Sequence, residues 1–109
     1  MRYEIERTLE FDRWLKKLKD RQAVVAISMR LSRIVLGNFG DAKPVGDDVH
    51  ELRLFIGPGY RMYYTIKNDT VIVLLVGGDK SSQEKDIRQA KELAIAIREA
   101  KHEREDGTV

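Results

Sequence analysis

The feature that most constrains the fold is the apolar run TVIVLLVG at positions 70–77. Such a short, continuous run is typical of a central strand buried on both faces. Two further strand patterns precede it, HELRLFI at 50–56 and YRMYYTI at 60–66, and short polar or glycine-rich turns at 57–59 and 67–69 separate the three. The spacing therefore predicts an antiparallel meander of three strands.

The N-terminal half predicts one strand and two helices. Residues 2–8, RYEIERT, alternate apolar and charged side chains, as in a strand with one buried face. Thr8 can then cap a helix, and the short segment KDRQ at 19–22 separates it from a second one that stops near Gly37. The two helices read as an antiparallel hairpin. Their apolar faces are Phe11, Trp14, Leu15 and Leu18 in the first, and Val24, Ile27, Leu31, Ile34 and Val35 in the second.

The remaining segments complete the order of elements. Residues 37–48, GNFGDAKPVGDD, carry the Gly, Asp and Pro content of a loop. Residues 81–105 predict a final helix, which Ser81 and Glu84 would begin as a capping box. The result is a single α+β domain over residues 1–109 with the order β-α-α-β-β-β-α. We expect a four-stranded, mainly antiparallel sheet with the helical hairpin on one face and the C-terminal helix closing the chain.

Composition limits the classes of function. The chain has 109 residues, a net charge of +2 and no cysteine, so neither disulfides nor thiol chemistry are available. It has no apolar run near the roughly 20 residues that span a bilayer, and no secretory signal pattern at its start, so we expect a cytoplasmic protein without membrane contact. His50 and His102 are far apart, so we expect neither a metal site nor another cofactor.

Strand alternation predicts a cationic patch. If Leu52 and Leu54 face the helical hairpin, Arg53 points the other way, and Arg61 and Tyr63 of the next strand lie on the same exposed face. Lys80, which follows the last strand, adds a further cation. These four side chains would form a surface for binding phosphates and stacking bases. An ordinary solvated sheet face is the alternative.

Three motifs together resemble one known family. They are T-x-x-F-x-x-W-L-x-x-L at 8–18, G-P-G-Y-R at 57–61 and G-G-D-K-S at 77–81. The chain resembles the addiction-module killer proteins of the Gp49/HigB-like branch of the RelE/ParE toxin superfamily, whose fold has the same element order. The resemblance implies the toxin of a type II toxin–antitoxin system, with a helix-turn-helix antitoxin as its partner.

The same resemblance leaves three activities open. Relatives of RelE and HigB type cut mRNA on the ribosome without a metal, whereas relatives of ParE type inhibit DNA gyrase. An inactive member that only binds its antitoxin is the third possibility. Fold alone cannot choose between them.

For RNA cleavage, the resemblance implies three catalytic residues. Arg61 would stabilise the phosphate, and Arg53 and Lys80 would assist it. The tyrosine that RelE-type enzymes carry near the start of the last helix has no counterpart in SSQEKDIRQ, and neither do HigB-type histidines beside Lys80. The general base is therefore unassigned, with Asp79 and Tyr63 as candidates. The expected RNA contacts are Tyr60, Tyr63, Asp79, Lys43 and Arg88.

Overall fold

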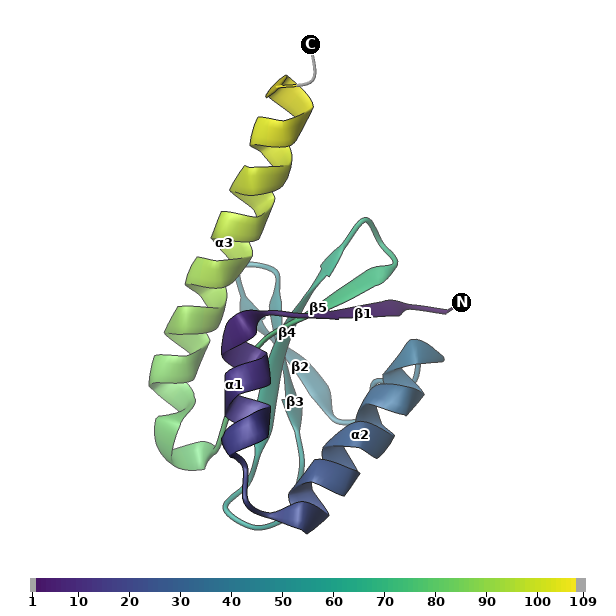
Figure 1. The fold of residues 1–109 in the computed structure, drawn as a ribbon, viewed down its shortest axis with the longest axis vertical. Helices are drawn as coiled ribbons and strands as arrows, with labels where there is room; N and C mark the ends of the chain where they lie inside the picture. Colours follow the sequence, from purple (N-terminus) through teal and green to yellow (C-terminus); the bar gives the residue numbers. More distant parts are fainter. Residues whose placement is uncertain (1, 108–109) are drawn as a thin grey trace.

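The computed structural model describes residues 2–107, with side chains described up to residue 100. Within this part of the chain, a sheet is flanked by helices on both faces (Figure 1). The elements are β1 (Glu4–Arg7), α1 (Leu9–Lys17), α2 (Arg21–Val35), β2 (Ala42–Gly46), β3 (Val49–Arg53), β4 (Arg61–Lys67), β5 (Val71–Gly78), the short 3₁₀ turn η1 (Lys80–Ser82) and α3 (Gln83–Gly107).

The sheet confirms the predicted α+β architecture and adds a strand. The strand order is β1-β5-β4-β3-β2, in which β1 pairs with β5 in parallel and the other neighbours are antiparallel. The sheet therefore has five strands, and the expected four is wrong. The additional strand, β2, lies inside the predicted loop 37–48 and carries Pro44. Proline is tolerated there because β2 is an edge strand, where one side of the backbone needs no partner.

The two helices that follow β1 begin at side-chain caps. The Thr8 hydroxyl accepts a hydrogen bond from the Phe11 amide at 3.0 Å and donates one to the Leu75 carbonyl at 2.6 Å, which ties the start of α1 to β5. The Asp20 carboxylate accepts from the Ala23 amide at 3.1 Å and so begins α2. Both caps satisfy amide groups that the helix itself leaves unpaired.

Each face of the sheet has its own hydrophobic core. The first core joins α1 and α2 to side chains such as Leu52, Met62 and Leu74. The second joins α3, through Ala90 and Ala94, to the opposite face. Figure 1 shows the sheet lying between α2 and α3. The face that we expected to be exposed is therefore largely covered, because α3 folds back across it.

No helix in the described range 2–107 is both long enough and apolar enough to cross a membrane.

Candidate active site

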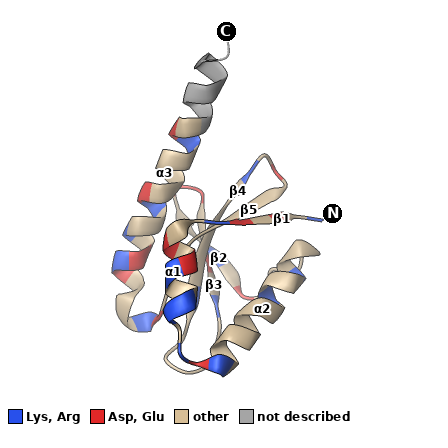
Figure 2. Cartoon of the chain, in the orientation of Figure 1, with Lys and Arg blue, Asp and Glu red and all other residues tan. Residues whose placement is uncertain are grey.

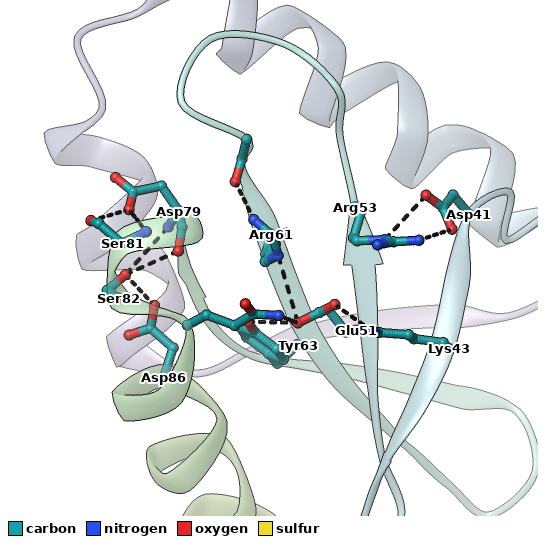
Figure 3. Close-up of polar contacts among 12 residues, drawn as sticks. Asp41, Lys43, Glu51, Arg53, Arg61, Tyr63, Asp79, Ser81, Ser82 and Asp86 are labelled. Atoms are coloured by element: carbon teal, nitrogen blue, oxygen red, sulfur yellow. Dashed lines mark hydrogen bonds and ion pairs between the residues drawn. The ribbon is translucent and has the colours of Figure 1, made fainter.

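The two predicted sheet arginines occupy paired positions on neighbouring strands. Arg53 of β3 lies opposite Arg61 of β4 in the antiparallel register, so both side chains leave the sheet on the same face. Figure 3 shows them side by side. Arg53 forms an ion pair with Asp41, with 3.3 Å between Nε and Oδ2, and its guanidinium lies 5.6 Å from the centre of the Phe55 ring. Asp41 thus neutralises Arg53 and fixes its direction.

Arg61 is held on two sides. Its Nη1 donates a hydrogen bond to the Gly59 carbonyl at 2.9 Å, and its Nε lies 3.8 Å from Oε2 of Glu51. Only 12% of the side chain is exposed. Within the described residues, the remaining terminal nitrogen, Nη2, has no hydrogen-bond or ion-pair partner. This side of the guanidinium is available to an anionic ligand.

Gly59 brings Lys80 close to Arg61. A side-chain carbon added at Gly59 would lie 3.3 Å from Nη1 of Arg61 and 3.8 Å from Cβ of Lys80, so this turn is packed between the two cationic residues. Gly59 also has a positive φ of 78°, which favours glycine. Lys80 is exposed and has no ion-pair partner among the described side chains. Arg61 and Lys80 of the predicted patch therefore both lie against one tight turn.

Asp79 is a turn residue at the start of η1. Its carboxylate accepts hydrogen bonds from the hydroxyl and the amide of Ser81, while its own amide donates to Ser82 Oγ at 3.3 Å. The expected capping box of Ser81 and Glu84 is therefore wrong, because Asp79 and Ser82 form it instead. The hydrogen bonds from Ser81 lower the pKa of Asp79. A carboxylate held in this way is a weak base.

Tyr63 does not lie on an exposed face, contrary to expectation. Its side chain is fully buried beneath α3, and its hydroxyl donates a hydrogen bond to Oε2 of Glu51 at 2.9 Å. Burial, together with the hydrogen bond to Glu51, raises the pKa of Tyr63 strongly. A phenol in this position has no surface on which a base could stack, and it holds its proton too firmly to act as a general base.

Tyr60 is also in the interior. It belongs to the first core, where its ring meets Trp14 edge-on at a centroid distance of 6.4 Å and its hydroxyl lies 3.4 Å from Oδ2 of Asp20. Strand alternation puts Tyr60 on the face opposite to that of Arg61, which is the core face. Tyr60 is therefore buried and leaves almost no exposed surface for the RNA contact that we expected of it.

Lys43 and Arg88, the remaining expected RNA contacts, lie on different elements. Lys43 is exposed on β2, with its Nζ 3.9 Å from Oε1 of Glu51. Arg88 is exposed on α3 and lines a shallow depression of about 550 Å³ together with Lys80 and Lys85. Arg53, Arg61 and Lys43 therefore form one group, and Lys80 links them to the cations of α3.

Sequence reasoning missed Glu51, which lies at the centre of this group (Figure 3). Its side chain is fully buried, and Oε2 accepts hydrogen bonds from Tyr63 and from Nε2 of Gln83, each at 2.9 Å. The other oxygen, Oε1, has no hydrogen-bond partner and only the distant Lys43 as a counter-charge. Strand alternation does place Glu51 on the same face as Arg53, and that was the available signal.

A charged groove adjoins the site. Figure 2 shows lysines and arginines on α1, at the connection to α2 and at the start of α3. The groove has a volume of about 510 Å³ and runs between α1 and α3, and its lining includes three basic side chains, Arg13, Lys17 and Lys85, and three acidic ones, Glu10, Asp79 and Asp86. These cations could contact the backbone of a nucleic acid outside the arginine pair, without reading its sequence.

Within the described residues, no group of three or more His, Cys, Asp or Glu side chains could hold a metal ion. His50, the histidine nearest the site, stacks on Tyr64 with 5.1 Å between ring centres.

The fold is that of the RelE toxins. A doubly substituted mutant of the Escherichia coli toxin RelE, solved in the free state, superposes with a TM-score of 0.70 at 18% identity, over 84% of this chain and 97% of that one. The toxin–antitoxin complex RelBE2 from Mycobacterium tuberculosis gives a TM-score of 0.58 at 21% identity, over 73% of this chain and 100% of that one.

The sequence matches define the family. The family described as phage-derived protein Gp49-like matches residues 13–101. An uncharacterized protein of Haemophilus influenzae is 51% identical over 94 residues, which cover 86% of this chain and 95% of that protein. The chain belongs to the Gp49-like family of phage-derived proteins, and its fold is the one that the resemblance to the RelE/ParE toxins implied.

Proposed function

We propose that this protein is the toxin of a type II toxin–antitoxin system and that it cleaves mRNA on the ribosome. The observation that carries the proposal is the Nη2 side of Arg61, which has no partner among the described residues, beside a turn that Lys80 also approaches. A guanidinium side open to an anion suits a phosphate group whose negative charge increases during the reaction. The fold shared with the RelE toxins supports the same proposal.

The reaction would be a transfer within the RNA chain. The ribose 2′-oxygen attacks the adjacent phosphorus, the bond from phosphorus to the 5′-oxygen breaks, and the products are a 2′,3′-cyclic phosphate and a free 5′-hydroxyl. The proton of the 2′-hydroxyl leaves to a base, and the 5′-oxygen gains a proton. Arg61 and Lys80 would stabilise the phosphorane, while Arg53, held by Asp41, would bind a neighbouring phosphate.

The protein contributes electrostatics more than proton transfer. Among the described side chains around Arg61, Tyr63 and Glu51 are buried and Asp79 is held by Ser81. The general base therefore remains unassigned. We infer that the ribosome orients the RNA for in-line attack, because correct positioning alone can lower the barrier by several kcal/mol.

We also propose a cytoplasmic protein with a helix-turn-helix antitoxin as its partner. The complex RelBE2 and the E. coli RelBE complex are toxin–antitoxin assemblies of the same fold, which supports an antitoxin for this chain. An antitoxin that covers Arg61 and Lys80 would block access of RNA to both cations.

The test is induction of the protein in cells, followed by mapping of new RNA 5′ ends. Wild-type protein should produce cuts within translated codons, and Arg61→Ala should reduce them at least 100-fold, as loss of one stabilising donor at a developing charge does. Arg21→Ala is the matched control, since Arg21 is exposed at the start of α2 and has no ion-pair partner among the described residues. It should cleave like the wild type.

Two outcomes would contradict the proposal. Growth arrest with intact messages and trapped gyrase–DNA complexes would identify an inhibitor of ParE type. Absence of arrest with the wild-type protein would identify a member that only binds its antitoxin.

A further inference from the structure

The buried carboxylate of Glu51 requires an explanation beyond packing. Its side chain has no exposed surface, although the sheet face around it is otherwise covered by an apolar core that includes Val49 and Leu75. Burying a carboxylate is unfavourable unless it is paired and hydrogen-bonded, and an apolar residue of similar size would often be at least as stable. A role at the site is therefore a better explanation than stability.

The surroundings hold this carboxylate in one orientation. Oε2 accepts one hydrogen bond from Tyr63 of β4 and another from Gln83 at the start of α3, both at 2.9 Å. Glu51 and Tyr63 are also directly paired in the register of β3 and β4. Two donors from two different elements leave the carboxylate little freedom to rotate.

The same oxygen faces the guanidinium of Arg61. The distance between Oε2 and Nε is 3.8 Å, and Nε has no hydrogen-bond partner of its own. On the other side, Nη1 is held by the Gly59 carbonyl. We propose that Glu51 is a positioning residue, which holds Arg61 by its Nε side so that Nη2 points toward the scissile phosphate. The catalytic part of this inference rests on the proposed function, whereas the contact between the two side chains does not.

The local charge balance fits a bound phosphate. Glu51 supplies one negative charge, and its neighbours Arg61 and Lys43 supply two positive ones. Arg53 is neutralised separately by Asp41. Asp79, which interacts electrostatically with Arg61, adds a second negative charge, and Lys80 next to it adds a third positive one. The cluster therefore has one positive charge in excess, which favours the binding of an anion.

The first test measures the contact itself, independently of any activity. In the wild type, NMR should show slow hydrogen exchange at the Arg61 Nε–H group. The signal of this group is the one that disappears in the variant Arg61→Lys. Glu51→Gln keeps the shape and removes the charge, so exchange should become at least about tenfold faster, because the electrostatic attraction that holds the buried guanidinium in place is lost. Glu92→Gln, an exposed change on α3, is the matched control. Unchanged exchange in Glu51→Gln would overturn the inference.

The second test asks whether the contact matters for cleavage on mRNA-programmed ribosomes. Glu51→Gln should lower kcat roughly 10- to 100-fold with little change in KM, as expected when a catalytic group is misplaced by about 1 Å. In the Arg61→Lys background the same change should have almost no further effect, because lysine lacks the Nε–H that Glu51 holds. Losses that simply add would show that Glu51 acts independently of Arg61 and would overturn the inference.

A variant with a milder effect on folding keeps the tests decisive. If Glu51→Gln does not fold, Gln83→Ala removes one of the two anchors of the carboxylate from a half-buried position. Gln83→Ala should accelerate hydrogen exchange at Arg61 Nε–H and lower kcat, as Glu51→Gln does. Wild-type values of both quantities would overturn the inference. Slow exchange at Arg61 in a wild-type protein that cleaves no RNA would contradict the proposed function and leave the contact intact.

Discussion

At the scale of single residues, the two neighbouring tyrosines of β4 show how alternation assigns side chains to different environments. Tyr63 points to α3 and pairs with Glu51, whereas Tyr64 points to α1 and α2 and stacks between aromatic rings. The ring centres of Phe39 and His50 lie 5.6 and 5.1 Å from that of Tyr64. Both phenols are buried and therefore resist ionisation.

The burial of Tyr64 predicts a loss of stability at alkaline pH. Burial raises its pKa from the ordinary 10.0 to about 12. The pKa of Tyr64 is higher in the folded protein than in the unfolded chain, so the unfolded chain ionises first as the pH rises. Tyr64 therefore leaves the free energy of unfolding unchanged below pH 10 and lowers it by about 1.4 kcal/mol per pH unit as the pH rises toward 12. Urea unfolding of the wild type and of Tyr64→Phe at pH 8, 10 and 11 should show a shallower decline in the variant. Equal declines would show that Tyr64 contributes nothing to it. Tyr63, whose pKa is also raised in the folded protein, should contribute the same decline in both proteins because it ionises only in the unfolded chain.

At the scale of elements, the end of β5 is packed between two helices. A side-chain carbon at Gly77 would collide with the Trp14 ring of α1, and one at Gly78 would collide with the Asp86 carboxylate of α3. The two glycines thus let α1 and α3 approach the strand from opposite sides. This close approach places η1, and with it Lys80, next to the turn that carries Gly59.

Gly77→Ala should therefore lower the free energy of unfolding by about 1–3 kcal/mol, the usual effect of overpacking a dense interior. Trp14→Leu in the same chain should recover part of this loss, since the smaller side chain frees the space that the new methyl group needs. Urea unfolding of the two single variants and the double variant measures the coupling. Strictly additive losses would show that the collision with Trp14 is not the cause.

At the scale of the whole molecule, Arg30 joins parts of the chain that are distant in sequence. From α2, its guanidinium donates hydrogen bonds to the carbonyls of Phe39, Arg53 and Asp41, at 3.1, 2.9 and 3.0 Å. These contacts connect the helix to the segment before β2 and to the end of β3. They also place Asp41 where it can pair with Arg53, so a residue outside the site shapes it.

Arg30→Lys should remove most of this connection, because an ammonium group cannot reproduce the planar fork of donors. We expect the free energy of unfolding to fall by about 2 kcal/mol, in the range for hydrogen bonds from a charged donor. Arg33→Lys is the matched control, as Arg33 is exposed and its side chain has no hydrogen-bond or ion-pair partner among the described residues. Its effect should stay within about 0.5 kcal/mol. Similar losses in both variants would contradict the role assigned to Arg30.

Local sequence patterns were enough to predict the order of the helices, the meander and the shared direction of Arg53 and Arg61. These features follow from periods of 3.6 and 2 residues, which act between near neighbours in the chain. The pairing of β2 as an edge strand and the burial of Tyr63 under α3 depend on long-range packing instead. The same is true of the meeting of Glu51 with Tyr63, Gln83 and Arg61. Such contacts join residues up to 32 positions apart, and no local pattern carries that information.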